Sequence, residues 1–144
     1  MQVKSSSVVA AGPLAAWAQF EFRGPSGRVV PKFFLKERLG LTGMEASLNW
    51  LPPGGGMPFT HRHERNEELY VFLTGTGEFQ LDNEVISISP GTCVRCDREV
   101  NRAWRCTGAE PLTFICIQAP AGGFGPGQTT ADGVKGDLPV AWAT

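Results

Sequence analysis

The chain of 144 residues lacks any apolar run near the roughly 18 to 20 residues of a membrane-spanning helix. It also lacks an excess of charge, because 13 Lys and Arg residues stand against 14 Asp and Glu residues. Without a basic stripe for phosphate contacts, a nucleic-acid-binding role is excluded. The N-terminal segment has no long apolar centre and is interrupted by Gly12 and Pro13, so it does not predict a signal peptide. We therefore expect a cytoplasmic protein that binds neither membranes nor nucleic acids.

Cysteine is scarce, and the four residues form no paired zinc-knuckle pattern. Cys93 and Cys96 have C-x-x-C spacing, but on an extended strand residues three apart point to opposite faces. These two thiols therefore cannot chelate one metal together. We interpret Cys93, Cys96, Cys106 and Cys116 as reduced thiols, which suits a cytosolic protein.

Helical periodicity longer than two turns is also absent, whereas glycine and proline are abundant at 18 and 11 residues. Short β-type runs separated by turn residues predict an all-β fold of the sandwich or barrel type. Residues 1–28 are expected to form an N-terminal arm, 29–120 the barrel and 121–144 a Gly-rich C-terminal arm. Trp17, Phe20 and Phe22 are the expected anchors of the first arm, and Val140 and Trp142 those of the second. The predicted strands are 32–35, 44–51, 69–73, 77–81, 84–88, 92–96, 102–106 and 112–119.

The only two histidines, His61 and His63, are two residues apart, so both imidazoles project from one face of an extended segment. Glu68 follows at the start of an apolar strand. If the chain turns at residues 65–66, that strand runs back beside the first and brings the carboxylate to both rings. Two imidazoles and one carboxylate form the facial triad of non-haem iron sites, and manganese, nickel or zinc would also be accepted. This pattern predicts a metal site at His61, His63 and Glu68.

The spacing is also that of a known family motif, G-x5-H-x-H-x3/4-E-x6-G, with Gly55, His61, His63, Glu68 and Gly75 at its five fixed positions. On these residues the sequence resembles the cupin superfamily, most closely its small one-domain bacterial members. The resemblance covers roughly residues 29–120. It implies an antiparallel β-barrel of the jelly-roll type and a homodimer formed by sheet packing or exchange of arms.

The second motif of the family departs from its usual form, G-x5-P-x-G-x2-H-x3-N. Aligned on Gly91 and Trp104, the sequence places Arg102 where the family has its fourth metal ligand, a histidine. Three interpretations of Arg102 stay open: it pairs with Glu68 and displaces the metal, it holds a substrate carboxylate or phosphate, or it turns outward into a surface ion pair.

Further candidates come from period-2 alternation on the same strands. Tyr70 shares a face with Glu68 and is a candidate for proton transfer or substrate contact, and Phe72 on that face is a substrate contact or a core residue. Trp104 and Cys106 share a face with Arg102 on a regular strand. Trp104 is a candidate substrate contact, and Cys106 is a candidate soft fourth ligand or a buried thiol.

Three functions follow from these residues. The first is a metal-dependent oxidoreductase or isomerase, in which Arg102 orients an anionic substrate and Tyr70 transfers a proton. The second is a module that binds a small organic anion with or without a metal. The third is a structural barrel whose site is a relic. The fold alone selects none of them, because cupins support many chemistries.

Overall fold

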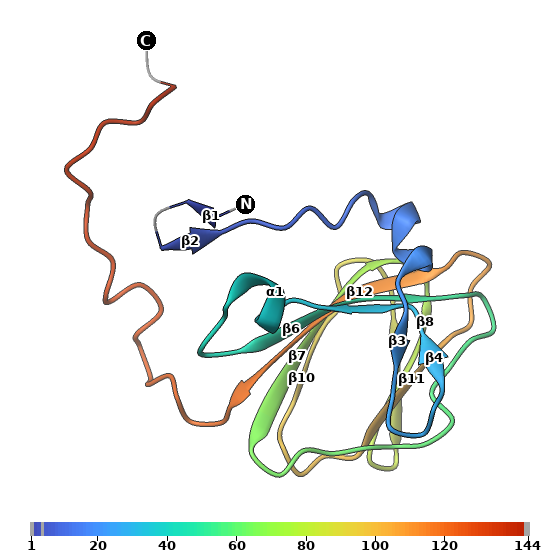
Figure 1. The fold of residues 1–144 in the computed structure, drawn as a ribbon. Coiled ribbons are helices and arrows are strands. Elements are labelled where there is room, and N and C mark those ends of the chain that lie inside the picture. Colours follow the sequence, from blue (N-terminus) through green and yellow to red (C-terminus); the bar gives the residue numbers. More distant parts are fainter. Residues whose placement is uncertain (1, 4, 143–144) are drawn as a thin grey trace.

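The computed structural model describes residues 2–3 and 5–142, and it contains all eight predicted strands (Figure 1). Their ends differ from the prediction by at most a few residues, the largest difference being that the strand carrying Glu68 begins at Asn66. The strands are β5 (Lys32–Phe34), β6 (Glu45–Leu51), β7 (Asn66–Thr74), β8 (Gly77–Leu81), β9 (Glu84–Ile88), β10 (Cys93–Cys96), β11 (Arg102–Cys106) and β12 (Leu112–Pro120).

These strands form two antiparallel sheets, one of five strands in the order β10-β7-β12-β6-β5 and one of three in the order β11-β8-β9. The last strand, β12, lies between β6 and β7 and pairs with both, which joins the beginning and end of the domain. All pairings are antiparallel and most connect strands distant in sequence. The predicted all-β jelly-roll class is therefore confirmed.

Turn residues hold the sheets in register. Asp82 adopts a left-handed conformation with φ of 52° in the predicted hairpin between β8 and β9. Gly75, the last fixed position of the first motif, has φ of 81°, and a Cβ there would collide with the carbonyl oxygen of Pro111. Two features therefore require glycine at position 75: the positive φ angle and the close approach of the Pro111 backbone.

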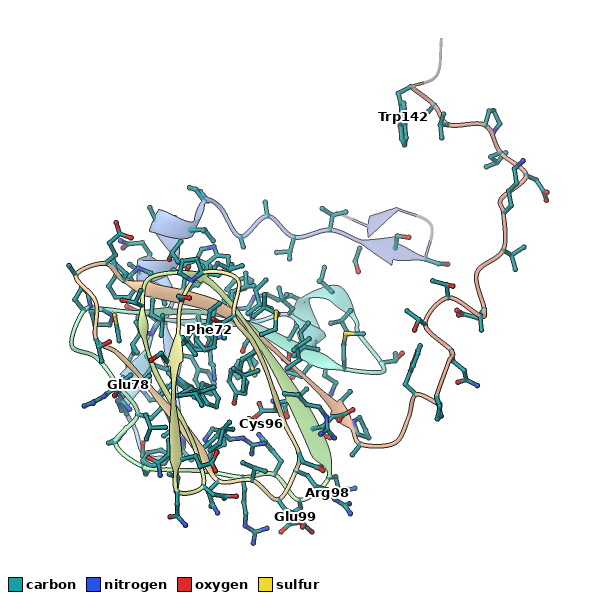
Figure 2. All side chains as sticks on the ribbon, turned by 180° about the vertical axis from the view of Figure 1, so that it is seen from behind. Phe72, Glu78, Cys96, Arg98, Glu99 and Trp142 are labelled. Carbon is teal, nitrogen blue, oxygen red and sulfur yellow. The ribbon has the colours of Figure 1, made fainter. Side chains whose placement is uncertain are left out.

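The core lies between the two sheets and contains a cluster of aromatic rings surrounded by aliphatic side chains and thiols. Phe72 is fully buried and packs on Phe79 and Phe114 at ring-centroid distances of 6.1 and 5.1 Å. Figure 2 shows Phe72 and Cys96 among the interior side chains. Cys96 is buried while Cys93 is exposed, so the two thiols occupy opposite faces of β10 as their spacing predicts.

The part of the chain before β6 contains short elements that the sequence did not predict. They are β1 (Gln2–Val3), β2 (Ser6–Ser7), the 3₁₀ helix η1 (Leu14–Gln19), β3 (Phe22–Arg23) and β4 (Val29–Val30), followed after β5 by α1 (Lys36–Leu39). Trp17 is buried, Phe20 stacks on Phe33 with centroids 4.6 Å apart, and Phe22 meets Phe34 edge-on at 4.9 Å. Phe20 and Phe22 therefore pack on β5, and Trp17 lies beside Phe20, which ties the arm to the larger sheet.

The C-terminal arm runs away from the barrel (Figure 1). Trp142 is 83% exposed and stands at the far end of the arm in Figure 2, and Val140 is also exposed. Neither expected anchor is covered by its own chain, and the homodimer stays a prediction. Among residues 2–3 and 5–142, no helix has the length and apolar character needed to cross a membrane.

Candidate metal site in the barrel

The segment of residues 61–63, here called the histidine segment, is held against β11 by backbone hydrogen bonds. The N–H of His61 donates to the carbonyl of Arg102 at 3.0 Å, and the N–H of Arg102 donates back to His61 at 2.9 Å. Two residues on, the N–H of His63 donates to the carbonyl of Arg98 at 3.0 Å. This ladder fixes both imidazoles on one face of an extended segment, as the two-residue spacing predicts.

Glu68 approaches these rings from the other sheet. It lies on β7, pairs with Cys96 of β10 and Gln118 of β12, and is only 3% exposed. The sequence-based expectation that β7 runs back beside the histidine segment is wrong, because His61 pairs with Arg102 of β11 instead. The site therefore bridges the two sheets across the interior.

The three side chains form a compact set of metal donors. The Nε2 atoms of His61 and His63 lie 3.7 and 3.2 Å from Oε1 of Glu68, and all three ligand atoms lie within 4.8 Å of one another. Metal–nitrogen and metal–oxygen bonds of about 2.0 to 2.2 Å place adjacent ligand atoms about 3 to 3.5 Å apart. Both the spacing and the donor chemistry of His61, His63 and Glu68 therefore fit a divalent transition metal.

The charge states of these groups suit the same role. Burial by itself would raise the pKa of Glu68, but the nearby His61 imidazole, the hydrogen bonds from Cys116 and Tyr70 and the charge of His63 lower it to about 2. Burial lowers the pKa of His63, although Glu68 partly opposes that shift. At neutral pH the site therefore presents a carboxylate and a neutral His63 imidazole, the forms that bind metals.

Two further donors hold the carboxylate of Glu68. The Tyr70 hydroxyl donates to Oε1 at 2.8 Å, and the Cys116 thiol donates to Oε2 at 3.1 Å. Burial raises the pKa of both the tyrosine and the thiol, and the nearby Glu68 charge raises both further. Tyr70 is thus a neutral hydrogen-bond donor that positions Glu68, and its proton-transfer role stays a prediction.

Arg102 is fully buried beside this group. Its Nε atom lies 3.5 Å from Oε1 of Glu68, and Nη2 donates to the carbonyl of Asp97 at 2.9 Å. Within the described part of the chain, Nε and Nη1 have no hydrogen-bond partner. Complete burial rules out the surface ion pair, and the guanidinium lies at ion-pair distance from the Glu68 carboxylate.

A partly enclosed cavity of about 180 Å³ adjoins the three donors. Apart from His61, His63 and Glu68, the residues of its wall are Lys32, Phe34, Ser47, Tyr70, Trp104, Phe114, Cys116 and Gln118. Tyr70 and Trp104, which the sequence suggested as substrate contacts, therefore line the cavity. The wall does not include Arg102, which lies behind the carboxylate.

Two other candidates lie elsewhere. Phe72 lies two residues after Tyr70 on the same face of β7. It packs in the hydrophobic core and does not line this cavity. The Cys106 thiol donates to the carbonyl of Glu110 at 3.2 Å and lies outside the cavity wall, so it is placed as a buried thiol and not as a fourth ligand. The thiol beside the donors is Cys116 on β12.

Sequence reasoning missed the other residues of the wall, of which Lys32 and Cys116 have titratable side chains; the rest are Phe34, Ser47, Phe114 and Gln118. The register of the sheet brings Cys116 opposite Tyr70, a long-range pairing that spacing cannot predict. A signal for Lys32 was present, because it alternates with Phe34 on a short aromatic strand and so shares its face. Burial lowers the pKa of Lys32, and Cys116, Glu68 and Glu45 oppose that shift.

Comparison with known proteins assigns the family. The profile of the cupin domain matches residues 50–118, which include the complete histidine and glutamate motif. The crystal structure of a cupin protein from Bacteroides fragilis is 39% identical, with a TM-score of 0.69 over 73% of this chain and 88% of that one. The chain belongs to the cupin superfamily. The resemblance predicted from the first motif is thereby confirmed.

Two curated relatives of this cupin are similar over shorter regions. An uncharacterized protein from Methanocaldococcus jannaschii is 29% identical over 68 residues, covering 47% of this cupin and 54% of the relative. A 5-nitrosalicylic acid 1,2-dioxygenase from Bradyrhizobium sp. is 31% identical over 80 residues, covering 55% of this cupin and 38% of the relative. This cupin therefore spans about half the length, or less, of the curated relatives it matches.

Proposed function

We propose that this cupin binds a divalent transition metal through His61, His63 and Glu68 and acts as a metal-dependent oxidoreductase on a small organic acid. The observation that carries the proposal is the position of the three ligand atoms, which converge within 4.8 Å of one another at the wall of a partly enclosed cavity. Three protein ligands leave further coordination positions of a metal available to a substrate. A purely structural site would use up those positions.

The protein groups have separable roles in this proposal. His61 and His63, fixed by the backbone ladder to β11, and Glu68, fixed by Tyr70 and Cys116, hold the metal. When bound, the metal supplies Lewis-acid and redox chemistry at its open positions. The rings of Trp104 and Phe114 line the cavity and exclude water from the substrate.

Similarity to a dioxygenase supports the choice of an oxidoreductase. The relative from Bradyrhizobium is named for the dioxygenation of 5-nitrosalicylic acid, an aromatic acid. The two-histidine, one-carboxylate donor set is that of non-haem iron oxygenases. Iron is therefore the metal we propose first, and a small organic acid is the substrate class.

A second function is favoured by one observation, the buried guanidinium of Arg102 at 3.5 Å from the ligand atom Oε1 of Glu68. A fixed positive charge at this distance disfavours a neighbouring dication. If that effect dominates, the protein is a metal-free module that binds a small organic anion. This alternative shares the cavity with the first function and differs from it in requiring neither metal nor turnover.

Oxygen consumption separates the two functions. We expect iron-loaded protein to consume dioxygen when salicylate, glycolate or malonate is added, with oxidised products identified by mass spectrometry. His63→Ala, given the same iron, is expected to be at least about 100-fold slower because it loses one of three ligands. Arg62→Ala, which changes the exposed residue between the two histidines, is the matched control and should retain the wild-type rate. Binding of these acids with no oxygen consumption would favour the metal-free module.

A further inference from the structure

Within residues 2–3 and 5–142, Lys32 is the one lysine in the wall of the cavity that contains the metal donors. It lies on the edge strand β5, and its alternation with Phe34 places both side chains on the cavity face. The two residues stay in contact, since the ammonium lies 5.2 Å from the centre of the Phe34 ring. A cationic group thus reaches the site from the larger sheet, whereas Arg102 lies on β11 of the smaller sheet.

The ammonium of Lys32 has no counter-ion of its own. Over residues 2–3 and 5–142 it makes no hydrogen bond or ion pair, and the Phe34 ring is its only direct partner. Of the nearby carboxylates, Glu68 pairs with Arg102 and both histidines, and Glu45 accepts backbone N–H bonds from Leu35, Lys36 and Ala46. Partly buried charges are ordinarily paired, so the cavity lacks one negative group.

We propose that Lys32 is the residue that recognises the carboxylate of a small organic acid bound in the cavity. This inference rests on the proposed function, because it names the substrate contact of the same site. One interpretation of the sequence gave the anion-binding role to Arg102; we assign this role to Lys32. Arg102 does not line the cavity and lies at ion-pair distance from Glu68, so among the described residues Lys32 is the cation in the wall that has no ion pair.

The walls and the volume favour a carboxylate over a phosphate. A single ammonium beside the rings of Phe34, Phe114 and Trp104 matches a carboxylate group of a small organic acid. A phosphate dianion typically needs an arginine or several donors together. The volume of about 180 Å³ is somewhat larger than that of a cavity of about 150 Å³ that binds benzene, so the ligand has about five to ten non-hydrogen atoms.

Calorimetric titration of Lys32→Met tests the proposal. The probes are glycolate and malonate, with malonamide as an uncharged molecule of the same shape and inorganic phosphate as the competing anion. We expect wild-type protein to bind the two carboxylates and Lys32→Met to bind them at least tenfold more weakly. Lys36→Met changes an exposed lysine four residues away and is expected to bind them as the wild type does.

Metal content, measured on the same samples, keeps this test apart from the proposed function. Lys32→Met is expected to hold as much metal as the wild type, and its unfolding curve confirms that it is folded. Equal carboxylate binding by wild type and Lys32→Met would overturn the inference, even if both contain metal. Tighter binding of phosphate, or equal binding of malonamide, would also overturn it. If neither protein contains metal but malonate binding still depends on Lys32, the inference stands and the oxidoreductase function fails.

Discussion

Glu68→Gln is expected to destabilise the metal-free protein by about 3 kcal/mol. The substitution keeps the size of the side chain but removes the negative charge that faces Arg102, a residue with no exposed surface. Removing one partner of a buried ion pair is costly because the other charge stays buried without compensation. Urea unfolding in the presence of a chelator, followed by tryptophan fluorescence, measures this loss.

The neighbouring residue provides the control. Glu67 pairs with Arg95 at 3.0 Å, but both side chains are substantially exposed, at 38% and 63%. Surface pairs contribute about 0 to 1 kcal/mol, so Glu67→Gln should change the free energy of unfolding by less than that. Glu68→Gln combined with Arg102→Met should lose at least about 1 kcal/mol less than the two single changes together. Additive losses would show that the two residues do not interact.

Arg102→His is expected to raise the metal affinity by at least about tenfold, since it removes a charge that repels the cation. Arg102→Met is also expected to raise the metal affinity, because it removes the charge without adding an imidazole. The difference between the two variants then measures whether an imidazole at this position adds a ligand. Competition with a chromophoric chelator gives the dissociation constant, and circular dichroism confirms that each variant is folded.

The control for this experiment lies on the same strand. Arg105 is 64% exposed and forms an ion pair with Glu78 on the outer surface, so Arg105→Met should leave the metal affinity unchanged. An Arg102→Met affinity equal to or below that of the wild type would contradict the assigned repulsion. It would mean that the guanidinium supports the donors, through its contact with Glu68, more than it opposes the metal.

The sequence predicted those parts of the fold that depend on local pattern. Eight strands followed from alternation and turn residues, and the two-residue spacing placed both histidines on one face. A family motif with five fixed positions then assigned the jelly roll. The predicted partner of the histidine segment was wrong because strand neighbours depend on long-range pairing. His61 lies beside Arg102, and β12 inserts between β6 and β7.

The same limitation explains the cavity residues that were missed. Cys106 and Cys116 are both thiols on predicted strands, and alternation alone cannot decide which of them lies beside Glu68. The pairing of Cys116 with Tyr70 decides it. The motif singled out Arg102, but only the packed structure shows that its guanidinium lies 3.5 Å from Glu68 and that Lys32 lines the cavity.

Metal analysis of protein purified without a histidine tag or chelator tests the central claim most directly. We expect inductively coupled plasma mass spectrometry to find close to one equivalent of iron, manganese, nickel or zinc per chain in the wild type. His61→Ala should contain less than about a tenth of that, because only His63 and Glu68 remain as ligands. A wild type that stays empty after incubation with each metal, while Arg102→His takes one up, would contradict the account and identify the protein as a metal-free binding module.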